Sequence, residues 1–146
     1  MAVATTPRPP PGIADLVVAE MALPAIGGDW KAALRARSAS AHEVLLRHPW
    51  ATGLTGTRIN VGPAMLRYID ATVGCLRAAG FSLPQADRAW NALDGHRYGF
   101  TLQELNFPRN RPHTSLRHNS SCRASHFDFG LDLILDGLER LLAASA

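Results

Sequence analysis

The segment that follows Phe127 carries apolar residues at intervals of three and four, the spacing of one face of an α-helix. Acidic and basic side chains occupy most of the remaining positions as far as Arg140. The apolar positions are Leu131, Ile134, Leu135, Leu138, Leu141 and Leu142. This pattern predicts a strongly amphipathic helix with an unusually wide apolar stripe, which only packing against other helices can cover.

Patterns upstream predict four more helices, within residues 13–21, 29–48, 63–80 and 82–107. Asp29 is a candidate N-cap, Pro63 suits a first helical turn, and Gly80 suits a C-terminal cap. Ser82 and Gln85 form an S-x-x-Q capping box. Residues 49–62 contain too many glycines and prolines for a long element, so we expect an irregular loop or short helical turns there. No segment alternates with period two, and the predicted fold class is all-α.

The chain has 146 residues, of which 47% are hydrophobic and 18% charged, and this is typical of one globular domain. We expect a disordered, proline-rich N-terminus at residues 1–12 and a single domain at residues 13–146. Residues 108–126 are predicted to form an irregular basic loop within that domain. No apolar run is long enough to span a membrane, and the N-terminus does not resemble a signal peptide. A cytoplasmic protein without membrane contact is expected.

The basic excess lies in one segment. The net charge is +3, and four arginines fall between residues 109 and 123. This segment lacks a helix-turn-helix pattern and interleaved aromatic residues, so we expect a solvated loop and no direct specific binding to DNA. Two cysteines, Cys75 and Cys122, are too few for the disulfide framework of a small secreted protein.

No nucleophile elbow, zinc-protease motif, phosphate-binding loop or dinucleotide fingerprint occurs, so the chain is predicted not to be an enzyme. No catalytic residue, cofactor or metal site is assigned. His118, Cys122 and His126 come nearest to a metal signature, but residues eight apart on a helix lie about 12 Å apart along its axis. Together with His96 they define the alternative hypothesis, a small helical enzyme or metal-binding domain.

The predicted helix at 82–107 places Arg97 and Glu104 on the same face as Trp90, Leu93 and Thr101. Two charges would then point towards an apolar interior, where they need partners. They could form a structural ion pair with each other, or pair with Arg58, with Asp70 or with the polar group of a ligand. The predicted pocket is lined by Leu54, Arg58, Leu66, Ile69, Trp90, Leu93, Arg97 and Glu104.

Gly95 and Gly99 lie inside the same predicted helix, where each glycine costs about 1 kcal/mol relative to alanine. They allow another helix to approach closely, or they relieve crowding within one subunit.

Seven motifs occur along the chain in a definite order and spacing. They are Asp29-Trp30, Leu45-Leu46-Arg47-His48-Pro49-Trp50, Gly56-Thr57-Arg58, Gly62-Pro63, Leu76-Arg77-Ala78-Ala79-Gly80-Phe81-Ser82, Tyr98-Gly99-Phe100-Thr101-Leu102-Gln103-Glu104 and Phe127-Asp128-Phe129-Gly130-Leu131-Asp132-Leu133-Ile134-Leu135-Asp136-Gly137-Leu138. Together they resemble the C-terminal core of tetracycline-repressor-like transcriptional regulators, and the resemblance covers about residues 13–107 and 127–142.

The resemblance implies a helical bundle domain with an inducer pocket between its helices, and it adds Thr57 and Thr101 to the candidate pocket residues. It also implies a dimeric four-helix bundle, in which the helix at 127–142 pairs with the helix at 82–107. The implied interface residues are Gly95, Gly99, Leu131, Ile134, Leu135, Leu138 and Leu142. The histidine with which tetracycline repressors chelate the drug's magnesium has no counterpart in residues 52–55, so recognition of tetracycline with magnesium is not expected.

Only residues 1–12 precede the first predicted helix, whereas the family carries an N-terminal helix-turn-helix domain. We therefore interpret the chain as the ligand-sensing and dimerisation domain of a repressor, truncated and unable to bind operator DNA alone. Its expected partners are a small apolar or amphipathic ligand and a second copy of the chain, or an intact paralogue in a heterodimer.

Overall fold

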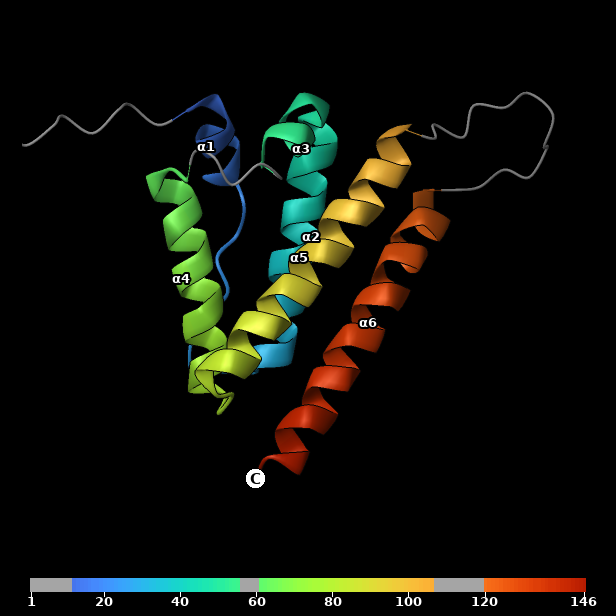
Figure 1. Cartoon of the computed structure of the whole chain (residues 1–146). Coiled ribbons are helices and arrows are strands. Elements are labelled where there is room, and N and C mark those ends of the chain that lie inside the picture. The colour runs from blue at the N-terminus through green and yellow to red at the C-terminus, as the bar shows by residue number, and fades with distance from the viewer. Residues whose placement is uncertain (1–11, 56–60, 107–119) are drawn as a thin grey trace, which may run out of the picture.

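The computed structural model describes residues 12–55, 61–106 and 120–146, with side chains from residue 126 onward in the last range. Over these ranges the chain is all-helical, as predicted (Figure 1). The helices are α1 (Ile13–Val18), α2 (Trp30–Arg47), α3 (Pro49–Thr55), α4 (Pro63–Ala78), α5 (Leu83–Asn106) and α6 (Ser120–Ala144). None of these helices combines the length and apolar character that a membrane-spanning segment needs. The predictions for residues 1–11 and 107–119 lie outside the described residues.

The predicted helix boundaries rest on caps that the structure contains. The Asp29 carboxylate accepts hydrogen bonds from the backbone N–H groups of Lys31 and Ala32 in the first turn of α2, both at 3.1 Å. Ser82 and Gln85 form the predicted reciprocal box, with distances of 2.9 and 3.3 Å, at the start of α5. Gly80 ends α4 with a φ of 109°, a left-handed conformation that favours glycine.

Residues Pro49–Thr55 form one short helix, α3, which agrees with the short helical turns expected there as one of two alternatives. One boundary differs from the sequence prediction. The prediction that residues 108–126 form a loop is wrong for residues 120–126, because α6 begins at Ser120 rather than at Phe127. Extending an existing helix costs far less free energy than starting one. The amphipathic helix after Phe127 can therefore be extended at its N-terminal end by polar residues that have no apolar periodicity of their own.

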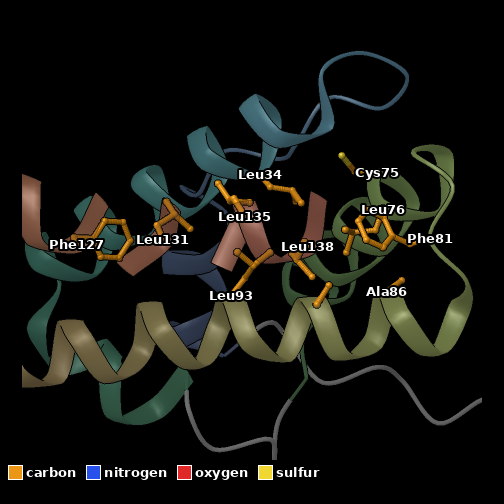
Figure 2. Packing of buried hydrophobic residues seen from close by; sticks show 11 residues of the cluster. Leu34, Cys75, Leu76, Phe81, Ala86, Leu93, Phe127, Leu131, Leu135 and Leu138 are labelled. Carbon is orange, nitrogen blue, oxygen red and sulfur yellow. The ribbon is translucent and has the colours of Figure 1, made fainter. Parts of the chain in front are cut away.

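The long helix α5 lies at the centre of the domain and packs against α2, α4 and α6 (Figure 1). One core cluster joins these four helices, with Leu34, Leu76, Leu93, Leu131 and Leu135 fully buried (Figure 2). A second cluster lies beneath α1 and joins it to α2, α3 and α4 through Val17, Leu45, Ala51 and Tyr68. The domain therefore has two core clusters, one centred on α5 and one that holds α1 against α2, α3 and α4.

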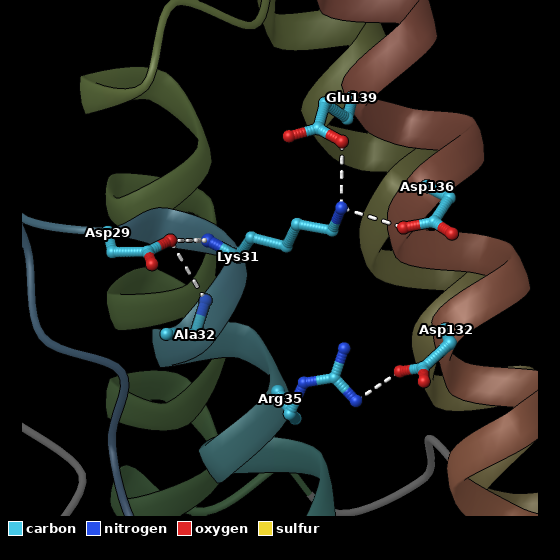
Figure 3. Close-up of polar contacts among 7 residues, drawn as sticks. All are labelled: Asp29, Lys31, Ala32, Arg35, Asp132, Asp136 and Glu139. Carbon is cyan, nitrogen blue, oxygen red and sulfur yellow. Dashed lines mark hydrogen bonds and ion pairs between the residues drawn. The ribbon is translucent and has the colours of Figure 1, made fainter.

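Ion pairs line the junction of α2 and α6 (Figure 3). Lys31 Nζ lies 2.7 Å from both Asp136 Oδ1 and Glu139 Oε2, and Arg35 pairs with Asp132. Hydrogen bonding to Asp136 raises the pKa of Lys31, and the same contact lowers the pKa of Asp136. Exposed pairs of this kind contribute little to stability. Their positions along both helices match the way in which α6 lies against α2.

Candidate functional site

A pocket of about 530 Å³ opens between α1, α4 and α5 beside the end of α3. Its size lies within the range of about 300–1,000 Å³ that is usual for small-molecule sites. The apolar part of the wall comes from four elements and the segment before α4: Val18, Leu54, Val61, Met65, Leu66, Ile69 and Trp90. The polar part includes Asp15, Asn91, Asp94, Arg97 and Tyr98. This apolar wall with a few polar groups is the usual chemistry of an organic ligand site.

Charged side chains are buried behind the α5 wall of the pocket. Arg37 Nη2, from α2, donates a hydrogen bond to Asp94 Oδ1 at 2.8 Å. Arg97 Nη2 lies 3.5 Å from the other oxygen of the same carboxylate. The Arg37 guanidinium also stacks over the Tyr68 ring, 4.2 Å from the ring centre. The two arginines thus share one carboxylate in the interior of the domain.

A further carboxylate, Asp15 of α1, caps α4 from 49 residues away in sequence. Its two oxygens accept hydrogen bonds from the backbone N–H groups of Ala64 and Met65, each at 3.0 Å. Asp15 is only 6% exposed, and it occupies the space that a side chain at Gly62 would need. The free N–H groups at a helix start favour negative charge, so this carboxylate is well compensated.

Five of the predicted ligand-binding residues line this pocket: Leu54, Leu66, Ile69, Trp90 and Arg97. Thr57 and Arg58 lie outside the described residues. The remaining three, Leu93, Thr101 and Glu104, are not part of the lining.

Leu93 belongs to the hydrophobic core, and Thr101 and Glu104 face α2 instead of the pocket. His42 of α2 contacts Thr101 Oγ1 and Glu104 Oε2, both at 2.9 Å. Glu104 therefore pairs with His42 and not with Arg97, and Arg97 pairs with Asp94 instead of Asp70. The same face of α5 lines the pocket at Trp90 and Arg97 and packs against α2 further along, near Thr101.

His42 and His96 enclose the Phe127 ring at the junction of α2, α5 and α6. The His42 ring stacks on Phe127 with 4.3 Å between centres, and the His96 ring does so at 5.1 Å. His96 Nε2 also donates to the Phe127 carbonyl oxygen at 2.9 Å. Burial lowers the pKa of His42, and the Glu104 carboxylate acts against this shift without cancelling it.

The histidines do not form a metal site in the described part of the chain. No group of three or more histidine, cysteine, aspartate or glutamate side chains is placed to hold a metal ion there. His96 is engaged with Phe127, and His126 is exposed. His118 and the side chain of Cys122 lie outside the described residues, so the alternative that combined these four residues is not assembled here.

The predicted dimer seam needs a correction. Leu131 and Leu135 are 0% exposed and Leu138 is 8% exposed, because they form the chain's own core with α2 and α5. Ile134 and Leu142 also pack against this core. Leu131, Leu135 and Leu138 therefore have almost no surface left for a second copy, because α6 packs against both α2 and α5 of its own subunit. Ile134 and Leu142 are only partly buried, so their place in an interface stays a prediction.

The apolar surface that α6 leaves open lies on its other side. Phe129, Leu133 and Leu141 are 67%, 58% and 41% exposed, and with Gly137 they follow one another every four residues. A methyl group placed on Gly95 or Gly99 of α5 would meet no atom within 4 Å, so these glycines relieve no crowding within the chain. The glycine that does permit close helix packing is Gly130, whose added methyl would lie 2.4 Å from the His96 ring.

Sequence reasoning missed Asp15, Arg37, His42 and Asp94. Arg37 and His42 lie in a helix with little amphipathic pattern, and nothing local distinguishes the buried Arg37 from the partly exposed Lys31 and Arg35. The one available signal was that a buried Arg97 requires an acidic neighbour, and Asp94 lies three residues before it on the same helix.

Comparisons with known proteins all find similarity to transcriptional regulators of one family. Residues 23–118 match the model of the family described as "Tetracyclin repressor-like, C-terminal domain". The HTH-type transcriptional repressor DrrR1 of Streptomyces coeruleorubidus is 26% identical over 145 residues, covering 80% of this chain and 54% of its own length. An HTH-type transcriptional regulator of Saccharopolyspora erythraea is 35% identical over 91 residues, covering 62% of this chain and 39% of its own length.

Among solved structures, a possible TetR family transcriptional regulator from Streptomyces coelicolor A3(2) superposes with a TM-score of 0.69 at 28% identity. The match covers 88% of this chain and 75% of that one. The chain spans about half the length, or less, of the curated relatives that it matches.

Proposed function

The chain belongs to the tetracycline-repressor-like family of transcriptional regulators as a C-terminal regulatory domain, and on this premise we propose that it senses a small molecule and dimerises. In this proposal the ligand occupies the pocket between α1, α4 and α5, and its binding relieves repression of transcription. The relatives are regulators rather than enzymes, which supports a role without catalysis.

The observation that carries the ligand-sensing role is the pocket itself. It has the volume of an organic ligand site, an apolar wall and a charged group, Arg97, buried at that wall. An apolar or amphipathic molecule would fit these groups.

Binding of a neutral fluorescent probe, N-phenyl-1-naphthylamine, tests the pocket. We expect fluorescence to saturate at one probe per wild-type chain. Gly95→Trp places a large side chain at the pocket wall, where the backbone leaves open space, and should abolish binding without unfolding. Gly28→Trp adds the same side chain to an open position in the loop before α2 and should bind like wild type. Equal binding by both variants would refute the assignment of the pocket.

We place the dimer interface on the open apolar face of α6, formed by Phe129, Leu133 and Leu141, together with the open surface of α5 at Gly99, which is not part of the pocket lining. Exposed apolar patches of this kind usually mark a contact with another chain. A twofold axis buries the same patch on both copies, and two helices from each copy then form a four-helix bundle. The partner is a second copy, or an intact paralogue with the same face. A wild-type chain that sediments as a monomer at high micromolar concentration would refute this placement.

The relatives are named HTH-type regulators, and the matched family is a C-terminal domain. We therefore assign operator recognition to a segment other than residues 13–146. In this proposal the domain controls such a segment through its ligand and its dimer, and has no sequence-specific contact with DNA itself.

A further inference from the structure

The interior beside the pocket carries more positive than negative charge. Arg37 and Arg97 are 1% and 5% exposed, and Asp94 is the carboxylate that contacts both. Two guanidinium groups and one carboxylate leave one net positive charge in this cluster. Charge in a poorly solvated region is costly unless it is matched by an opposite charge.

The two arginines are not equally compensated. Arg37 has the short contact to Asp94 at 2.8 Å and the face of the Tyr68 ring. Arg97 has only the longer contact at 3.5 Å. The Nε and Nη1 atoms of both arginines have no hydrogen-bond partner among the described residues, so the difference lies in the contact to Asp94 and in the Tyr68 ring. Of these two arginines, Arg97 is the one that lines the pocket. The less compensated of the two charges therefore belongs to a residue in the wall of the space that a ligand would occupy.

The other carboxylate of the lining does not remove this imbalance. Asp15 is held by the two backbone N–H groups at the start of α4, which already satisfy its charge. It repels anions at its own position, so an acidic group is expected next to Arg97 and away from Asp15.

We propose that this pocket binds an organic anion, with an apolar ring system against Leu66, Ile69 and Trp90 and one acidic group beside Arg97. The inference rests on the proposed function, because it names the chemical class of the ligand for the same pocket. A hydrogen bond to a charged partner in a poorly solvated site contributes more than a neutral one. The anion should therefore be preferred over a neutral molecule of the same shape.

Two fluorescent probes with the same ring system provide the test. The first, 8-anilino-1-naphthalenesulfonate, carries an acidic group, and the second, N-phenyl-1-naphthylamine, lacks it. We expect the full wild-type chain to bind the sulfonate at least about tenfold more tightly, at one probe per chain. Arg97→Met should remove this preference, whereas Arg97→Lys should keep most of it. Arg88→Met removes an exposed charge from the same helix, outside the pocket lining, and should bind both probes like wild type.

A second variant, with the opposite expected effect on anion preference, keeps the test informative if Arg97→Met fails to fold. Asp94→Asn removes the carboxylate that the two arginines share, so the ratio of sulfonate affinity to neutral-probe affinity should rise several-fold above that of the wild type. Equal affinity for both probes in the wild type, with saturable binding that Gly95→Trp blocks, would overturn the anion inference and leave the proposed pocket standing. Absence of binding by both probes would overturn the proposed function itself.

Discussion

Removal of the Asp15 carboxylate should destabilise the domain more than the loss of an ordinary helix cap. Asp15→Ala deletes two hydrogen bonds of 3.0 Å from a buried carboxylate and leaves the N–H groups of Ala64 and Met65 without acceptors. A hydrogen bond to a charged group contributes about 1.5–3 kcal/mol, and part of this is returned because the carboxylate no longer has to be desolvated. We expect a loss of about 3 kcal/mol in the free energy of unfolding, or about 10 °C in Tm for a chain of this size.

Asp29→Ala is the matched control. Asp29 also accepts hydrogen bonds from two N–H groups of a helix start, but it is exposed and caps its own helix. Its loss should cost about 1 kcal/mol. Urea unfolding of both variants, followed by circular dichroism, gives the two free energies on one scale. Equal losses for the two variants would refute the argument that Asp15 stabilises the domain by joining α1 to α4 in a buried site.

Three further perturbations give expected results. Leu133→Asp should yield a folded monomer in sedimentation velocity. Leu83→Asp, at an equally exposed leucine of α5, should leave the dimer intact. A dimeric Leu133→Asp variant together with a monomeric Leu83→Asp variant would place the interface elsewhere. Gly130→Ala should lower the free energy of unfolding by about 1–3 kcal/mol, since the added methyl overlaps a ring held by stacking and a hydrogen bond, while Gly53→Ala in open space should not destabilise. Burial lowers the pKa of His42, so its side chain takes up a proton less readily in the folded chain than in the unfolded one, where its pKa is about 6.5. The contribution of His42 to the free energy of unfolding should therefore be fully present above pH 6.5 and be lost as the pH falls below it. Urea unfolding at a series of pH values should show a smaller loss of stability at low pH for His42→Gln, and an unchanged pH dependence would contradict the assignment.

The elements that were predictable from sequence have their signals within a few residues. The Ser82 and Gln85 box, the Asp29 cap and the Gly80 terminus each follow from local backbone chemistry, and the structure contains all three. The face of α5 that lines the pocket was also partly predictable, because helical spacing places Arg97 on the same face as Trp90. Its exact extent was not, since it depends on where α2 crosses α5.

The misassigned features depend on contacts between distant segments. Arg37 lies 57 residues from Asp94, and no local pattern links them. Leu131 and Leu133 are both leucines of one helix, yet the first is fully buried and the second 58% exposed. Amphipathic spacing identifies which residues share a face, but it does not say whether that face meets the same subunit or another.

The central position of α5 has a thermodynamic consequence. One side of this helix forms the pocket wall that contains Arg97, and another side holds α6 through His96 and Phe127. If a ligand favours one setting of α5, and if that setting changes how two α6 faces meet, then ligand affinity and dimer affinity are linked by a single coupling free energy. Linkage makes this coupling reciprocal: the factor by which a ligand strengthens or weakens the dimer must equal the factor by which dimerisation changes ligand affinity. Ligand titrations at two chain concentrations, one below and one above the dimer Kd, would then measure communication across α5 without any DNA present.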